Sequence, residues 1–453
     1  MKNTFAKFSL SRIFLWVIIL FSIFFTLNKR NWKEGVIYWD IISYYAYLPA
    51  AFIYNDLTLS YIENPDFKGT VWPETAENGG KVIKTTMGLA ILYAPFFFMA
   101  HGLALTMDGY PPDGYSMIYS LFLLISNLFY TIIGFVFLRK ILLKYFSDNI
   151  TAVLLLIVFF CTGLFYYTFY TVMSHSYLFC LINIFIFYII KWHENPSFKT
   201  SLFIGLLSGM ILLIRPIDII FCLLFVFYGV YNFKSLNYNI KLFLKQYKKI
   251  VLIIISGFCV FFIQMVYWKT ITNQWLFWSY SGESFFWTKP HIIEGLFGFR
   301  KGLYLYTPIL LPATLGLFLL KKFDKNWIVI FPVLFILFTY IILCWWSWWY
   351  GGGLSIRPYI DIYGIMAIGL GAFISIICKL KQTILKVFAL SVICTLSLYS
   401  AFVVNQYTSG SIHWDSMTKE SWKSSFGKSL PPHGFYETLK APDYEKAKAT
   451  GEE

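Results

Sequence analysis

One carboxylate, Asp40, follows the first apolar run of the chain, in the stretch Tyr38-Trp39-Asp40-Ile41-Ile42-Ser43-Tyr44-Tyr45-Ala46-Tyr47-Leu48-Pro49. An ionisable side chain near hydrocarbon is costly, so it is a candidate for function. If the stretch is helical, Asp40, Tyr44 and Tyr47 fall on one face at i, i+4 and i+7. One acid and two phenols suit a hydroxyl-rich ligand. The alternative is an interfacial helix with its tyrosines in an aromatic belt.

Four more short segments carry side chains for polar chemistry. They are Met173-Ser174-His175-Ser176, Arg215-Pro216-Ile217-Asp218, Gly298-Phe299-Arg300-Lys301-Gly302, and the run from Trp345 to Pro358 with Asp361 a turn later. Their cations, Arg215, Arg300, Lys301 and Arg357, are predicted to hold a phosphate group. Asp40 is then predicted to take a proton from an attacking hydroxyl, while the fixed cations stabilise the leaving anion. His175 is a further candidate for binding phosphate or acceptor.

The run Trp348-Trp349-Tyr350-Gly351-Gly352-Gly353 joins aromatic rings to three glycines. Aromatic faces commonly stack on sugar rings, and glycines let the backbone approach a ligand closely. We therefore expect Trp348, Trp349, Tyr350 and Gly352 to contact substrate, and we expect the same of Tyr44 and Tyr45.

Each of these candidates also has a structural interpretation. Arg215 could extend its charged end to the surface and pair with Asp218 at i+3. His175 could be a hydrogen-bonded structural residue. Arg300 and Lys301 could be loop charges, and the tryptophans could be interfacial anchors.

The composition indicates a membrane protein. Among 453 residues, 58% are hydrophobic, 21% aromatic and only 13% charged, about half the charge of a soluble chain. Apolar runs long enough to cross a bilayer recur along the sequence. The expected spans are 13–28, 116–138, 150–167, 175–190, 199–214, 216–231, 250–268, 303–320, 326–346, 359–378 and 384–404, giving an all-α polytopic fold of about eleven transmembrane helices.

The charge distribution predicts the orientation. With a cytoplasmic N-terminus, the inner segments are 1–12, 139–149, 191–199, 232–249, 321–325 and 379–386. They contain 19 of the 37 Lys and Arg residues but only three of the 23 acids, as the positive-inside rule requires. The formal net charge of +14 thus indicates membrane orientation rather than nucleic-acid binding. If 87–106 crossed, the Lys-rich loops would face outward, so we expect it to be re-entrant or to lie on the surface.

This topology divides the chain into a transmembrane domain, 1–404, and a short outer tail, 405–453. The first outer loop, 29–115, contains juxtamembrane helices, and a second long outer loop covers 269–302. Asp40 and all the other candidate residues then face one compartment.

At this point the sequence resembles the GT-C superfamily, polytopic glycosyltransferases that use polyprenyl-phosphate sugars. The stretch Trp39–Pro49 is similar to the Asp-x-x-x-Tyr-Tyr loop of bacterial mannosyltransferase-like membrane proteins. The run Trp348–Gly353 with Arg357 is similar to their aromatic-glycine-arginine loop. The resemblance implies that Asp40 is the catalytic carboxylate, acting as a base or orienting a divalent metal (Mg or Mn). Many relatives have a second acid beside the first, where this chain has Ile41.

The resemblance implies an inverting transfer of sugar from a polyprenyl-phosphate donor to a hydroxyl of a glycan, lipid or protein. The expected location is a bacterial plasma membrane, with the active site and C-terminus on the outer side. One alternative is a transporter or flippase of lipid-linked glycans, for which an internal repeat and a midplane site would be expected. Another is a polysaccharide ligase or acyltransferase centred on a His or Arg.

Overall fold

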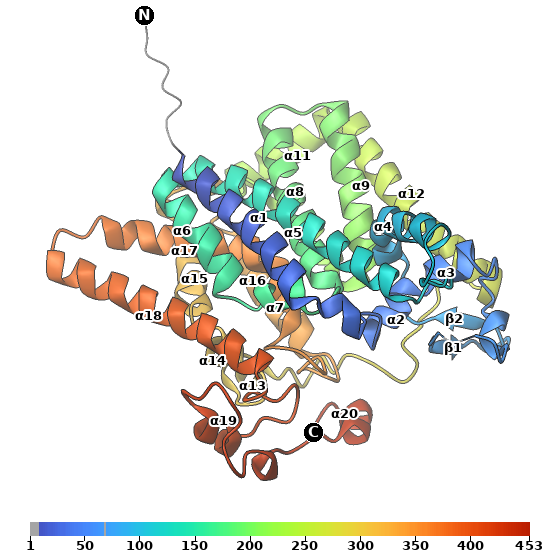
Figure 1. The fold of residues 1–453 in the computed structure, drawn as a ribbon. Coiled ribbons are helices and arrows are strands. Elements are labelled where there is room, and N and C mark those ends of the chain that lie inside the picture. Colours follow the sequence, from blue (N-terminus) through green and yellow to red (C-terminus); the bar gives the residue numbers. More distant parts are fainter. Residues whose placement is uncertain (1–8, 68) are drawn as a thin grey trace, which may run out of the picture.

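The computed structural model describes residues 9–67 and 69–453, and helices dominate it (Figure 1). Seven of the helical segments described are long and apolar enough to cross a membrane. They are α1 (Leu10–Lys29), α5 (Met117–Tyr145), α8 (Ser174–Glu194), α12 (Tyr247–Thr272), η5 with α16 (Lys325–Trp327 and Ile330–Leu343), η6 with α17 (Arg357–Ile362 and Tyr363–Cys378), and α18 (Thr383–Thr408). An all-α polytopic membrane protein, as the sequence predicts, is confirmed at this level.

The other four expected spans are shorter or broken helices. They correspond to α6 (Asp148–Phe160) with α7 (Leu164–Phe169), α9 (Phe198–Ile214), η3 (Pro216–Phe221) with α10 (Cys222–Phe227), and α14 (Leu303–Tyr306) with α15 (Leu310–Leu317). Pro216 and Pro308 stand at two of these breaks, because proline has no backbone N–H and its ring clashes with the preceding turn. The count of eleven crossings is therefore not confirmed.

Segments predicted to lie on the inner side meet at one end of the bundle. Ser9 donates a hydrogen bond of 2.8 Å to Asp148, and Arg139 lies 4.0 Å from the same carboxylate. Lys144 pairs with Glu194 at 2.6 Å. These contacts join the first three expected inner segments; residues 1–8 of the N-terminal one lie outside the described residues.

The first outer loop folds into short elements beside the end of α1. They are η1 (Asn31–Glu34), α2 (Asp40–Tyr45), α3 (Tyr47–Phe52), η2 (Ser60–Glu63), and the antiparallel strands β1 (Pro73–Thr75) and β2 (Lys81–Ile83), in which Glu74 faces Val82. The small hairpin was not predicted.

The apolar helix α4 (Gly88–Ala104) covers the run 87–106. Its start touches the end of α9, where a Cβ on Gly88 would lie 2.5 Å from the Ile214 nitrogen. Near its other end, His101 Nδ1 lies 2.6 Å from the Tyr119 hydroxyl, in the first turn of α5. Both ends of α4 thus lie beside helix ends opposite the inner segments.

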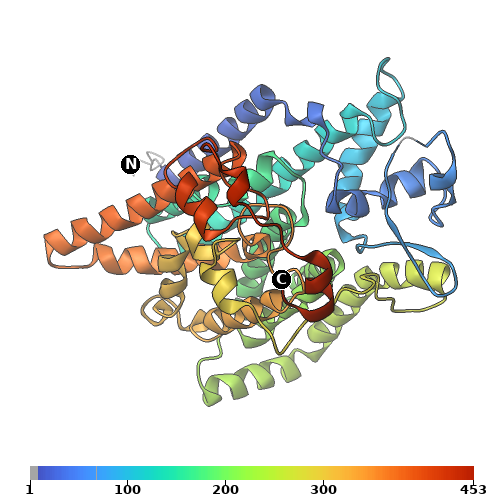
Figure 2. The same ribbon diagram turned by 90° about the horizontal axis from the view of Figure 1, so that it is seen from below.

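The remaining helices are short and lie at the two ends of the bundle. They are α11 (Phe233–Lys245), η4 (Leu320–Lys322), α13 (Ile292–Phe297), α19 (Lys419–Ser425), η7 (Tyr436–Thr438) and α20 (Tyr444–Thr450). In Figure 1, α11 lies at the top, and α19 and α20 of the tail lie at the bottom. Seen from below, the red tail lies across the yellow and orange segments (Figure 2).

Candidate functional site

Asp40 is the first residue of α2 and its carboxylate is half exposed. The preceding residue, Trp39, has φ +49° and ψ −133°, a conformation that non-glycine residues seldom adopt. This turn separates α2 from the chain leaving α1. Arg357, the first residue of η6, donates a hydrogen bond from Nη2 to Asp40 Oδ2. Two residues far apart in the sequence, both predicted for the site, are therefore in direct contact.

Beside this pair lies a buried cluster centred on Asp361. One carboxylate oxygen of Asp361 lies 2.9 Å from His175 Nδ1, and the other accepts a 2.8 Å hydrogen bond from Arg215 Nη1. The start of α8, the end of α9 and η6 supply the three side chains. Asp361 and His175 are buried, and Arg215 is nearly so. The carboxylate fixes the orientation of both partners, and the hydrogen bond at Nδ1 leaves His175 Nε2 free to interact elsewhere.

Asp218 is the second buried carboxylate near Arg215. It lies in η3, and its side chain is inaccessible to solvent. Neither carboxylate oxygen has a hydrogen-bond partner among the described residues. The pairing of Asp218 with Arg215, which was the structural alternative for these two residues, is not made as a hydrogen bond, because Arg215 donates to Asp361 instead. A buried polar group without a partner is costly, so Asp218 destabilises this cluster unless a ligand supplies a partner.

The two tyrosines predicted to contact substrate have different surroundings. The Tyr44 hydroxyl lies 3.5 Å from Ser174 Oγ. Burial, followed by the nearby Asp40 carboxylate, raises the pKa of Tyr44, so it remains a neutral hydroxyl beside that carboxylate. The Tyr45 hydroxyl donates to the Gly114 carbonyl at 2.6 Å. Tyr45 therefore fastens the first outer loop, and Tyr44 is the one that faces the cluster.

Arg300 and Lys301 contact the tail and the glycine run. Arg300 lies 2.8 Å from Glu453 and donates to the Asp415 carbonyl at 2.5 Å. The Lys301 ammonium nitrogen is buried and donates to the carbonyls of Gly353 and Trp414. Burial lowers the pKa of Lys301 to about 7. The structure places their hydrogen bonds on the protein itself, and a role for either residue in holding phosphate stays a prediction.

The tryptophans predicted to stack on sugar are inside the protein. Trp348 is 2% exposed and lies against the ring of His291, with centroids 5.6 Å apart. Trp349 is fully buried and packs edge-on against Tyr444 of the tail, at 5.5 Å. The Tyr350 hydroxyl donates to the Ile342 carbonyl at 2.9 Å. In this conformation the rings of the aromatic run pack inside the protein and hold the loop that carries the glycines.

The glycine run connects these buried rings to Arg357. The Gly352 carbonyl accepts a 3.2 Å hydrogen bond from Arg357 Nη1. Gly353 has φ +151°, and a Cβ at this position would lie 2.3 Å from the Tyr167 hydroxyl. Only glycine fits there, because both the backbone conformation and the space exclude a side chain. The run thereby orients the guanidinium that holds Asp40.

The structure gives contacts in the site to residues that had no role assigned from the sequence. Asp361 joins His175 to Arg215, and its place one turn after Arg357 was the available signal. Lys84 pairs with Glu283 at 2.6 Å and lies 5.3 Å from the centre of the Tyr280 ring. Burial, and then the nearby Tyr44, raises the pKa of Tyr280. This second group comes from the first outer loop and the loop 269–302, whose mutual approach no local pattern indicates.

Within residues 9–67 and 69–453, no group of three or more His, Cys, Asp or Glu side chains has an arrangement that could hold a metal ion. His175 and Asp361 hydrogen-bond each other, and the Asp40 carboxylate accepts a hydrogen bond from Arg357. The residues present therefore provide no protein-only cage for the divalent metal that the resemblance implies.

Comparison with known proteins provides no family assignment. No family model matches the chain, and no curated protein matches it. The class of protein that the structure itself defines is a helical, multi-pass membrane protein with a cluster of ionisable side chains at one end of the bundle.

Proposed function

We propose that the protein is a membrane glycosyltransferase that transfers a sugar from a polyprenyl-phosphate donor to an acceptor hydroxyl. The observation that carries the proposal is the contact between Asp40 and Arg357 beside the Arg215–Asp361–His175 cluster. It combines a half-exposed carboxylate with two guanidinium groups at one end of a membrane bundle. A carboxylate suits removal of a hydroxyl proton, and guanidinium groups suit a phosphate.

In the proposed reaction, the acceptor oxygen attacks the anomeric carbon of the donor sugar while Asp40 takes the hydroxyl proton. The bond between the anomeric carbon and the phosphate oxygen breaks, and polyprenyl phosphate leaves with the electron pair. Attack opposite the leaving group inverts the anomeric configuration. No step is routed through a metal.

Arg357 binds Asp40 and still has N–H groups available to bind the leaving phosphate. A guanidinium has five N–H donors, and the hydrogen bonds to Asp40 and Gly352 use two of them. Arg215 is held by Asp361 through one nitrogen. Preorganised donors of this kind stabilise charge that develops on a leaving group.

The proposed topology places this site outside the cytoplasm of a bacterial cell, with the N-terminus inside. Two features support it: the basic inner segments meet at one end of the bundle, and both ends of α4 lie at the other. We accordingly propose that α4 is re-entrant. The tail, held by Arg300, would then cover the outer end of the bundle.

The test is mass spectrometry of surface glycans and lipids from a strain that lacks the protein, compared with the same strain carrying it. Loss of one sugar, restored by the wild-type chain, is expected. An unchanged glycan and lipid profile would contradict the proposal.

A second candidate function has one observation in its favour. The buried contact between His175 and Asp361 has the form of a histidine oriented by a carboxylate, which serves acid–base or nucleophilic catalysis in other enzymes. It favours a ligase or acyltransferase centred on His175. In that case His175→Ala abolishes activity while Asp40→Asn retains it, whereas the glycosyltransferase proposal requires Asp40.

A further inference from the structure

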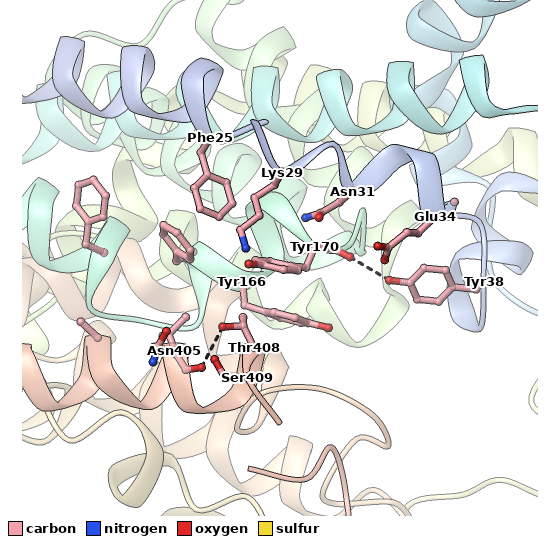
Figure 3. Close-up of a pocket in the computed structure, with 15 residues that line it drawn as sticks. Phe25, Lys29, Asn31, Glu34, Tyr38, Tyr166, Tyr170, Asn405, Thr408 and Ser409 are labelled. Carbon is pink, nitrogen blue, oxygen red and sulfur yellow. Dashed lines mark hydrogen bonds between the residues drawn. The ribbon is translucent and has the colours of Figure 1, made fainter. Parts of the chain in front are cut away.

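A partly open groove of about 870 Å³ lies between α1, α7 and α18. Figure 3 shows Phe25 and Lys29 of α1 pointing toward Tyr166 of α7 and Asn405 of α18 across the cavity. Its volume lies within the range of small-molecule sites, about 300–1,000 Å³. None of the residues predicted for the site lines this groove.

One part of the groove is apolar. Phe25, Phe160, Phe165 and Val404 line it. Phe25 lies one turn before the end of α1, a helix long and apolar enough to cross the membrane. With α1 taken as a membrane span, this part of the groove is expected to face the hydrocarbon region, and a hydrocarbon chain is the occupant that its apolar surface favours.

The other part of the groove is polar but close to neutral. Lys29 and Glu34 provide one charge of each sign, and the other polar lining groups are amides and hydroxyls, including Asn31, Asn405 and Thr408. Among the described residues, no arginine lines the groove. A phosphate head would favour a cluster of cations, and such a cluster lies elsewhere, at Arg215 and Arg357. The charge balance thus favours an uncharged polar head.

Aromatic rings in this polar part suit a sugar. Tyr166 and Tyr170 stack with centroids 5.4 Å apart and planes 13° from parallel. Tyr38 donates a 3.0 Å hydrogen bond to the Tyr170 carbonyl, which fixes the edge of the groove. Amides and hydroxyls beside flat aromatic faces bind polyhydroxyl groups by hydrogen bonding and apolar contact.

Residues adjacent in the chain connect the groove with the Asp40–Arg357 pair. Tyr38, at its edge, precedes Asp40 by two residues. Tyr166 is followed by Tyr167, whose hydroxyl lies against Gly353. An occupant whose head reaches past Tyr38 would meet the carboxylate proposed as the base.

We propose that the groove binds a membrane lipid with a neutral, hydroxyl-rich head group, and that this lipid is the acceptor. The identification as the acceptor rests on the proposed glycosyltransferase function. The inference that such a lipid binds depends only on the shape and lining of the groove.

The experiment uses the full chain in lipid nanodiscs and an alkyl glucoside with a photoreactive diazirine in its alkyl chain. An alkyl phosphate and an alkyl phosphocholine with the same chain serve as comparison probes. Mass spectrometry maps the labelled peptides. We expect the glucoside to label α1 and α18 about tenfold more than the alkyl phosphate does, a difference of about 1.4 kcal/mol in binding.

Two variants test the two parts of the groove. Ala401→Trp fills the apolar part, because Ala401 lines it, and should abolish labelling of α1 and α18. Asn405→Leu removes an amide from the polar part and should reduce the preference for glucoside over phosphate. Leu398→Trp, three residues before Ala401 on the same helix at a side chain 66% exposed, is the matched control and should label like the wild type.

Labelling that is equal for all three probes, or that persists in Ala401→Trp, would overturn the proposed site. The same labelling experiment on Asp40→Asn should give wild-type labelling of the groove, because this variant loses the proposed base but keeps the lipid site. If the groove labels as expected but no sugar transfer is found, the lipid site stands and the glycosyltransferase proposal fails. If sugar transfer occurs and Ala401→Trp transfers to lipid as fast as Leu398→Trp, the groove is not the acceptor site.

Discussion

Arg357 donates a hydrogen bond to Asp40 from a position 317 residues further along the chain. The pair joins the first outer loop to the loop that follows α16. Because Asp40 is half exposed, the pair is expected to contribute little to stability, about 0–1 kcal/mol. In the proposed function, the role of the pair is to orient the Asp40 carboxylate.

Asp40→Asn should therefore leave the fold intact. We expect its unfolding free energy, measured by denaturant titration in detergent micelles, to stay within about 1 kcal/mol of the wild type. A loss of several kcal/mol would show that the pair is structural. A loss of activity in this variant would then reflect unfolding rather than a catalytic role of Asp40.

The two buried carboxylates should respond differently to the same substitution. Asp361→Asn leaves Arg215 without its hydrogen-bonded counter-ion, and breaking a buried pair costs on the order of 3 kcal/mol. Asp218→Asn replaces a buried carboxyl group that has no hydrogen-bond partner among the described residues, so its loss of stability should be smaller than that of Asp361→Asn. The same titration compares them, and equal losses would contradict the assigned contacts.

Gly353 and Gly351 form a second matched pair. Both have positive φ, but a Cβ on Gly351 meets no atom within 4 Å, whereas one on Gly353 meets the Tyr167 hydroxyl. Gly353→Ala should lower the thermal midpoint more than Gly351→Ala, by an amount equivalent to about 1–3 kcal/mol. Adding Tyr167→Phe should recover part of the loss. Equal midpoints for the two alanine variants would count against this loop geometry.

Lys301 should make stability depend on pH. Its pKa is lowered by burial to about 7, while a lysine in the unfolded chain titrates near pH 10.4. Between these values the unfolded chain binds one more proton, so this lysine's contribution to stability rises with pH, by at most about 1.4 kcal/mol per unit. Below pH 7 both states are protonated and the contribution is smallest.

The measurement is the unfolding free energy from pH 6.5 to 9 for the wild type and Lys301→Met. The variant should lose the rise that Lys301 contributes. Parallel curves would show that Lys301 remains charged in the fold.

The sequence was sufficient to bring Asp40, His175, Arg215 and Arg357 to one end of the bundle. Asp40 follows the first apolar run and the other three lie at the ends of apolar runs, and the lysine-rich loops assign those ends to one side. Hydropathy could not predict that the run 303–320 breaks, because Thr307 and Pro308 hardly change the average over a span. It also could not distinguish an exposed indole from a buried one, since Trp348 and Trp349 are apolar in either place. The contacts of Arg300 and Lys301 depend on how the tail folds back, and no local pattern encodes that.

The most direct test of the central claim is sugar transfer by Asp40→Asn. The strain lacking the protein is complemented with the wild type, Asp40→Asn or Asp66→Asn, an exposed acid of the same loop that is the matched control. Mass spectrometry then measures the sugar that the wild type restores. We expect restoration by Asp66→Asn and none by Asp40→Asn at equal protein level. Full restoration by Asp40→Asn would contradict this expectation.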